Sequence, residues 1–470
     1  MTSSFGALNT AFTGLVAARQ GLTVVGDNIS NSTTVGYSRQ VASTSSMTPA
    51  SESGFADPLQ VGDGVAVNAA TRVDSPFADA QLRVTSAADG YAHEAATQLS
   101  AIEAALNEPG GNGLSSALQS FWSAWQNVST TSNSSSAATA VIAAGGRVAA
   151  LIASGYTAAS SQWSSVRSGV DTTVASVNAA ATRVAALNGQ IRSIVAAGGN
   201  ANGLMDQVGT LATTLANLSG ATVRSNADGT TDILLGGNQL VAGTVVNSIA
   251  ASGSPNLAGA AAAPVTIGFV DNPSATAGIS GGTLGAELAM LAPANGTATG
   301  GAIAEAAQSY NSLATTVANS VNSIMQTGAT PSGVTGLAFF ALDASRPPAL
   351  GLSVIPVDSS GIAAATPGAG AANGDIAGSL AQLMSSTTGA DSQWETFVVR
   401  TGEMAKAANS QATLTSAGLA SAVASQSSVS AVDTDQETTN MLAYQNAFSA
   451  AARVMVAVND MLDTLINKTG

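Results

Sequence analysis

The C-terminal segment carries an unbroken heptad pattern, and this feature constrains the fold more than any other. Apolar residues recur there at spacings of 3-4-3-4-3-4-3, at Met441, Tyr444, Phe448, Ala451, Met455, Val458, Leu462 and Leu465. Polar residues such as Asn446, Arg453 and Asp460 lie between them. The pattern predicts a long helix whose single apolar seam has to be covered by another helix.

The N-terminal segment has a stripe of the same period. Its members are Phe5, Leu8, Phe12, Leu15, Leu22, Val25 and Ile29, with Arg19 at a position where an apolar residue is due. An isolated helix of this length is marginal in water, and each large seam residue contributes roughly 1.5–3 kcal/mol when fully buried. We therefore expect the two terminal helices to form an assembly interface, ordered mainly by association with each other and with neighbouring subunits.

Helical periodicity also returns inside the chain, around residues 91–106, 163–194, 303–324 and 394–424. Short apolar runs separated by turn residues at 220–245 and 264–270 indicate strands, and Gly and Pro punctuate 329–374. The sequence predicts a mainly α fold with a β-rich middle, in which paired terminal helices form a coiled-coil base below a central rod of antiparallel helices.

The expected domains are nested, because the two ends of the chain meet. Residues 1–45 with 425–470 are assigned to the terminal coiled-coil domain, and 46–215 with 300–328 and 375–424 to the helical rod. Residues 216–299 form a β-rich region and 329–374 a small β-containing insertion. In this arrangement the middle of the sequence is expected to lie farthest from the terminal base.

Composition excludes several classes of function. Charged residues make up 9% of the chain against roughly 25% in an average soluble protein, and the net charge is −14. The basic residues are scattered singly, so neither nucleic acid nor an anionic membrane is an expected partner. No cysteine is present, and the N-terminus lacks the basic start and continuous apolar core of a signal peptide, so we expect no disulfides and no cleaved leader.

The sequence contains few residues or motifs that could support catalysis. The chain has one histidine, His93, in a helical stretch, and no HExxH or phosphate-binding GxxxxGK motif. The acidic cluster Asp433, Asp435 and Glu437 fits the start of the last helix better than a metal site, because Asp433 with Gln436 resembles a capping box. Phe121, Trp122 and Trp125 favour buried helix packing over a ligand platform. We expect no enzyme activity, no metal and no cofactor.

A polar segment after the first helix carries the most specific pattern. It contains Asp27, Asn28, Ile29, Ser30 and Asn31, and then Gly36, Tyr37, Ser38, Arg39 and Gln40. Physical chemistry alone predicts the end of a helix and an ordered turn here. The DNISN and GYSRQ segments, together with MLDTLI at 461–466, resemble the flagellar axial proteins, and within them the hook-associated protein 1 family more than rod or hook proteins. Weaker matches such as LMDQ at 204–207 extend the resemblance through the interior.

This resemblance implies a structural protein of the bacterial flagellum that is exported by the flagellar type III apparatus and sits extracellularly as a ring between hook and filament. It further implies three partners besides other copies of the chain: the hook protein, hook-associated protein 3, and a cytosolic export chaperone that holds the C-terminal helix. The seam from Met441 to Leu465 would then serve both the chaperone and the assembled ring.

Three alternatives remain open from the sequence. The chain could be another axial protein, either hook-associated protein 3 or a flagellin. It could be a secreted adhesin with a ligand-binding β middle, although it shows no internal repeats. It could carry a glycan hydrolase site, which would need two facing carboxylates among Asp228, Asp232, Asp271 and Glu287.

Overall fold

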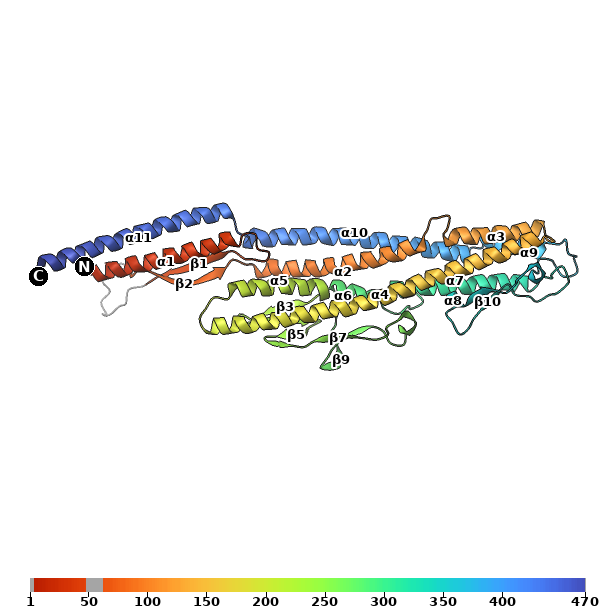
Figure 1. Cartoon of the computed structure of the whole chain (residues 1–470), viewed down its shortest axis with the longest axis horizontal. Helices are drawn as coiled ribbons and strands as arrows, with labels where there is room; N and C mark the ends of the chain where they lie inside the picture. The colour runs from red at the N-terminus through yellow and green to blue at the C-terminus, as the bar shows by residue number, and fades with distance from the viewer. Residues whose placement is uncertain (1–3, 48–61, 470) are drawn as a thin grey trace.

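The computed structural model describes residues 4–47 and 62–469. The molecule is elongated, and the described ends of α1 and α11 lie side by side at one tip (Figure 1). Its helices are α1 (Ser4–Ser30), α2 (Pro76–Leu106), α3 (Leu114–Thr130), α4 (Ser135–Ala196), α5 (Asn202–Ser219), α6 (Gly282–Met290), α7 (Ala302–Met325), α8 (Pro348–Gly351), α9 (Asp375–Ala381), α10 (Ala390–Ser430) and α11 (Thr434–Thr469).

The longest helix, α4, is the centre of the rod and packs against α3, α5 and α7. The apolar periodicity predicts a helix only over 163–194, whereas α4 begins at Ser135, where Ser134 caps it by accepting a hydrogen bond from the Ala137 N–H. The missed half is rich in Ala and Gly, with Val141, Val148 and Ile152 keeping the buried stripe in phase. Length and apolar composition alone would let α4 cross a membrane, but a buried stripe against three helices is typical of a central rod helix.

The antiparallel helices α2 and α10 form a second layer of the rod, and α2 also contacts α5 and α6 (Figure 1). Ser75 caps the N-terminus of α2, and Pro76 is the first residue of this helix. At its C-terminus, Asn107 adopts a left-handed backbone conformation. Away from the termini, Phe121 packs against Trp122 and Trp125 on α3 and against Phe339 and Phe340. The predicted burial of this aromatic run is thus confirmed.

The strands form small antiparallel sheets. One sheet has the order β3-β4-β5-β6 and another β7-β8-β9, while β1 pairs with β2 and β10 with β11. Their bounds are β1 (Gln40–Ser46), β2 (Val65–Arg72), β3 (Thr222–Ser225), β4 (Thr231–Leu235), β5 (Asn238–Ala242), β6 (Val245–Val246), β7 (Ile249–Ser252), β8 (Thr266–Phe269), β9 (Asn272–Thr276), β10 (Phe340–Leu342) and β11 (Leu352–Val354). Strands expected over 220–245 and 264–270 are present as β3 to β6 and β8.

Two expectations about the β segments were wrong. Strand β2, assigned to the helical rod, pairs with β1 in a hairpin that packs on α1 and so joins the terminal helices. The β-rich middle of the sequence lies along the side of α4, and the tip opposite the termini is formed by α3, α9 and the segment around β10 (Figure 1). The nesting therefore fails for 216–299, because these sheets bury their apolar face against α4 and α5.

Candidate assembly interface

Helices α1 and α11 lie antiparallel over most of their length (Figure 1). The heptad seam of α11, here called the first seam, faces α1, and its described side chains are half-buried or buried: Met441, Tyr444, Phe448, Ala451, Met455, Val458 and Leu462. In the described part of the chain, only α1 covers the first seam, which is why most of these side chains keep some exposure. Leu465 belongs to the same stripe, but its side chain, like that of Phe5, lies outside the described residues.

The face of α1 that meets α11 is not the predicted one. It is a stripe of small residues one position earlier, here called the packing face: Ala7, Ala11, Gly14, Ala18, Gly21, Val25 and Asn28. A Cβ added at Gly21 would overlap the Tyr444 ring, and one at Gly14 would lie 4.0 Å from Ala451 Cβ. Large side chains of α11 therefore pack into a groove of small residues on α1, as knobs packed into holes require.

The predicted α1 stripe instead flanks this contact. Leu8, Leu15, Leu22 and Ile29 are half-buried, and Val25 is shared with the packing face and fully buried. Phe12, expected in the seam, is 53% exposed and does not join the helix pair. The predicted stripe differs from the packing face by one residue, because the prediction followed the large apolar side chains. Two helices that pack closely need small side chains at their contact.

Buried Asn28 organises the turn after α1. Its Nδ2 donates to the Gln40 carbonyl oxygen at 2.9 Å, while its Oδ1 accepts from the Gln40 N–H and from the Tyr37 hydroxyl, both at 2.9 Å. Burial raises the pKa of Tyr37, which keeps its hydroxyl protonated as a donor. Asn28 thus fixes both ends of the GYSRQ segment with one side chain.

The rest of the motif shapes the connecting turn. Asn31 Nδ2 donates to the Asp27 carbonyl oxygen at 3.0 Å, and the Ser30 hydroxyl donates to Gly26 at 2.8 Å. Gly36 adopts a positive φ of 80°, which a glycine adopts without strain. These contacts confirm the predicted helix end and ordered turn.

Ser38 connects the motif to the rod. Its backbone N–H donates to Asp206 Oδ2 on α5 at 3.2 Å, and Arg72 Nε at the end of β2 lies 2.9 Å from Asp206 Oδ1. Burial raises the pKa of Asp206, although Arg72 and the Ser38 N–H both favour the ionised form. Asn202, also on α5, donates to Gln40 Oε1 at 2.9 Å and to the Ala70 carbonyl oxygen at 2.8 Å.

Arg39 connects the same segment to the turn between α10 and α11. Its N–H donates to the Ser430 carbonyl oxygen at 2.8 Å, and its guanidinium Nη1 lies 3.3 Å from Gln436 Oε1 and 3.8 Å from the buried carboxylate of Glu437. GYSRQ therefore joins α1, α5 and α11 at one point, where the terminal pair meets the rod. The sequence pattern predicts the turn of the motif but none of these partners.

The acidic cluster begins α11 as predicted. Asp433 Oδ1 accepts from the backbone N–H groups of Asp435 at 3.0 Å and Gln436 at 3.2 Å. Among the described residues the reciprocal half of the expected capping box does not form, because the Gln436 side chain accepts from Arg39 instead. No group of three or more His, Asp or Glu side chains suited to a metal occurs within residues 4–47 and 62–469.

The one histidine has a Ser and an Asp beside it, but not in a catalytic arrangement. His93 Nε2 on α2 lies 2.8 Å from Ser416 Oγ on α10 and 3.5 Å from Asp89 Oδ1. A Ser-His-Asp triad needs the carboxylate on the opposite ring nitrogen from the serine. Here one nitrogen faces both groups, so the three residues form a polar contact between α2 and α10.

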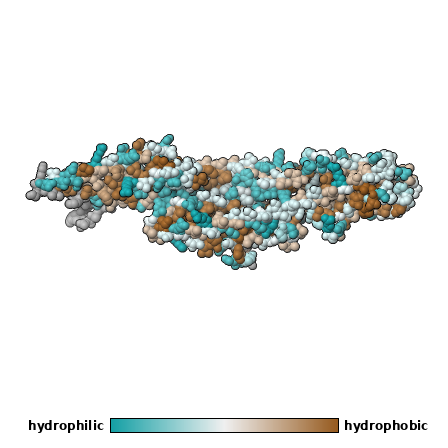
Figure 2. Space-filling view, viewed as in Figure 1, coloured by the Kyte–Doolittle hydropathy of each residue, from teal (hydrophilic) through white to brown (hydrophobic). Residues whose placement is uncertain are grey.

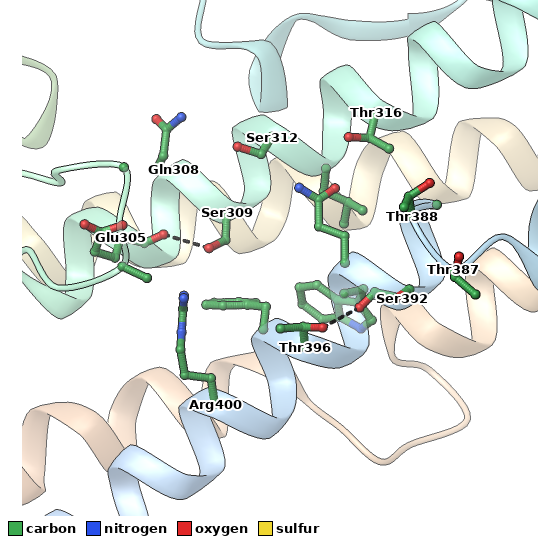
Figure 3. A pocket seen from close by; sticks show the side chains of 17 residues that line it. Glu305, Gln308, Ser309, Ser312, Thr316, Thr387, Thr388, Ser392, Thr396 and Arg400 are labelled. Atoms are coloured by element: carbon green, nitrogen blue, oxygen red, sulfur yellow. Dashed lines mark hydrogen bonds between the residues drawn. The ribbon is translucent and has the colours of Figure 1, made fainter.

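A groove of about 500 Å³ lies between α7 and the start of α10 (Figure 3). Its labelled lining consists mainly of hydroxyl and amide side chains, among them Ser309, Ser312 and Thr396. Its carboxylate, Glu305, already accepts from the backbone N–H groups of Asn295 at 2.8 Å and Gly300 at 3.1 Å. The groove offers neither a paired carboxylate nor a nucleophile with a base.

The four carboxylates considered for glycan hydrolysis lie in different segments of the chain or already accept hydrogen bonds from neighbouring side chains. Asp232 pairs with Arg224 on the neighbouring strand at 2.6 Å, and Asp228 accepts from the Thr230 hydroxyl at 2.6 Å. Glu287 is buried on α6 against α4, and Asp271 is exposed beside β9. We therefore take the junction around GYSRQ, which links α1, α5 and α11, as the candidate site.

Comparison with known proteins identifies the family of the chain. A family model described as the flagellar hook-associated protein FlgK helical domain matches residues 99–340. A protein named flagellar hook-associated protein 1, from Bacillus subtilis (strain 168), is 30% identical over 505 aligned residues that cover 100% of this chain and 99% of the relative. The chain belongs to the flagellar hook-associated protein 1 family.

Further matches extend to the C-terminal helix and to the fold. A model described as the flagellar basal body rod FlgEFG protein C-terminal region matches residues 425–468, which cover the end of α10 and nearly all of α11. The structure of the flagellar hook junction protein FlgK from Burkholderia pseudomallei covers 74% of this chain and 100% of that chain, with a TM-score of 0.65 and 16% identity. At this identity the likeness establishes a shared fold.

Proposed function

We propose that this chain is a structural adaptor that self-assembles into a ring joining the flagellar hook to the filament. The observation that carries the proposal is the full-length match to a hook-associated protein 1, since a relative aligned over both terminal helices and the rod shares the parts that assembly needs. Membership of that family makes the chain a structural component of the flagellum. The same match favours this family over a flagellin, hook-associated protein 3 or an adhesin.

The organisation of the molecule supports the proposal. The terminal domain comprises α1, the β1–β2 hairpin and α11, and it is joined to the rod by the short connections around residues 73–75 and 431–433. The backbone N–H groups of Ser38 and Arg39 donate to Asp206 on α5 and to the Ser430 carbonyl oxygen at the end of α10, and these contacts hold the two parts in a defined arrangement. An adaptor between the subunit lattices of the hook and the filament needs two such parts. One part packs against neighbouring subunits, and the other projects from them.

The partners follow from the same proposal. The ring contacts the hook protein on one side and hook-associated protein 3 on the other. Export proceeds through the flagellar type III apparatus, and before export a cytosolic chaperone covers the first seam of α11. Removing residues 441–470 should then abolish chaperone binding in a pull-down with the purified chaperone. Unchanged binding would place the chaperone site elsewhere.

A labelling experiment tests the location. The chain has no cysteine, so a Val357→Cys variant, changed at a side chain that is 92% exposed, carries a single thiol for maleimide-gold. Gold confined to one narrow band between hook and filament supports the proposal, and the unmodified protein is the blank. Gold along the whole filament would indicate a flagellin, and gold over the cell body an adhesin.

A further inference from the structure

A second apolar stripe runs along α11 outside its contact with α1. Its members, here called the second seam, are spaced 4-3-4-3-4 and are all exposed: Ala443, Ala447, Ala450, Val454, Ala457 and Met461. At 100° per residue this stripe lies roughly 110° around the helix from the first seam. Most members are alanines, so the second seam is a shallow surface that another helix can approach closely.

Helix α1 exposes a stripe of the opposite kind. Asn9, Phe12, Val16, Arg19 and Thr23 are spaced 3-4-3-4 and are all exposed. Phe12 and Val16 are its bulky members, with 53% and 40% of their surface exposed. Apolar patches are visible on the end of the molecule formed by α1 and α11 (Figure 2). Bulky side chains left in water at the end of a helix pair indicate a contact with another molecule.

We propose that the Phe12 stripe of one copy packs into the second seam of the next copy. This inference rests on the proposed function, because it describes how copies arranged around one axis meet. The two stripes differ in size, bulky on α1 and small on α11, which is the same complementarity that the chain uses internally between Tyr444 and Gly21. A contact between two different faces is heterologous, and repeating it generates a ring or a helical array.

Rotational symmetry determines the height along the helices, here called the level, at which the two copies meet. Gly21 faces Tyr444 and Gly14 faces Ala451 within one chain, so Phe12 lies level with the segment Ala450–Val454. In a closed ring whose axis runs parallel to these helices, copies related by rotation keep the same level and the same antiparallel direction. Phe12 of one copy therefore meets the second seam of its neighbour between Ala450 and Val454.

Cysteine cross-linking in assembled flagella tests this contact. Cells lacking the native gene are made to express two variants together, Phe12→Cys and Val454→Cys, and sheared flagella are oxidised and run on a non-reducing gel. The expected result is a disulfide-linked dimer in the co-expressing cells, with at most a trace when either variant is expressed alone. Val16→Cys with Ala450→Cys is a second pair at the neighbouring level, in case Phe12→Cys impairs assembly.

A matched control lies within the chain. In a Gly14→Cys, Ala451→Cys double variant the two Cβ atoms would be about 4.0 Å apart, which suits a disulfide. Its bridge forms inside one chain and gives no dimer, which shows that the terminal pair is folded under the oxidising conditions. If this control bridge forms while both test pairs stay monomeric, the inference is wrong. Dimers from Val454→Cys alone would also overturn it, because they require contact between two copies of α11.

A pair of charge substitutions separates this inference from the proposed function. Ala450→Glu places a carboxylate on the second seam, whereas Ser449→Glu places the same charge on an exposed position of α11 outside both seams. We expect at least a tenfold loss of assembled protein at the junction for Ala450→Glu and little change for Ser449→Glu. Equal assembly of both variants at the junction would reject the second seam and leave the junction role standing. Absence of the unmodified protein from the junction would reject the function itself.

Discussion

Among the described residues, no positively charged side chain pairs with Glu287 in the rod. It is 5% exposed, on α6 between α2 and α4, and its Oε1 accepts from the Thr173 hydroxyl at 3.2 Å. Burial raises the pKa of Glu287 to about 7, the Thr173 hydrogen bond opposes this change, and the nearby carboxylate of Glu94 adds to it. The same carboxyl in an unfolded chain has an ordinary value near 4.5.

The sign of the pH dependence follows from these two values. Between pH 4.5 and 7 the folded rod keeps a proton on Glu287 that the unfolded chain releases, so stability falls as the pH rises through this window. Above pH 7 Glu287 is ionised in both the folded and the unfolded chain, so the free-energy cost of burying its charge stays constant. A difference of about 2.5 pKa units corresponds to about 3 kcal/mol at full burial.

Hydrogen exchange of the α6 amides gives a direct test with Glu287→Gln, which keeps the shape and cannot ionise. After correction for intrinsic exchange rates, the opening free energy of α6 should fall by about 3 kcal/mol more between pH 4.5 and 8 in the native chain than in the variant. Asp171→Asn, an exposed carboxylate on α4, is the control and should keep the native profile. Parallel profiles for the native chain and Glu287→Gln would refute this reasoning.

Two further predictions concern the terminal pair and its connection to the rod. Gly21→Ala should weaken α1–α11 pairing by about 1–3 kcal/mol, because the added Cβ overlaps the Tyr444 ring. Gly26→Ala is the matched control: its Cβ would have nothing within 4 Å, so this variant should be neutral or stabilising by up to about 1 kcal/mol. Thermal unfolding followed by circular dichroism measures both variants. Asn28→Ala should cost about 2–4 kcal/mol, since it leaves buried groups around Tyr37 without partners, and urea unfolding followed by Tyr37 exposure measures it.

Each of these has a contradicting outcome. If Gly21→Ala and Gly26→Ala unfold at the same temperature, α11 does not pack on the small residues of α1. If Asn28→Ala leaves both the free energy of unfolding and the environment of Tyr37 unchanged, the three hydrogen bonds of Asn28 do not fix the motif.

Large side chains made some elements predictable from the sequence. The first seam of α11 is a regular heptad with Tyr444, Phe448 and Met455, and it faces α1 as expected. The start of α11 was equally clear, because Asp433 carries the chemistry of a helix cap. Both features are local, so neighbouring residues contain the needed information.

Other parts of the structure depend on contacts that no local pattern reveals. The packing face of α1 is made of Ala and Gly, which a search for hydrophobic periodicity passes over. The β1–β2 hairpin escaped prediction because QVASTSS has few apolar residues and is ordered by packing on α1. The partner of Ser38, Asp206, lies 168 residues away, so only the folded rod places a carboxylate beside GYSRQ.

Deletion of the gene tests the central claim most directly. Electron microscopy of the deletion strain, with an assay for flagellin in the culture medium, should show hooks without filaments and filament subunits released outside the cell. Re-expression of this chain should restore filaments and swimming. Normal filaments on the deletion strain would contradict a role in joining hook to filament.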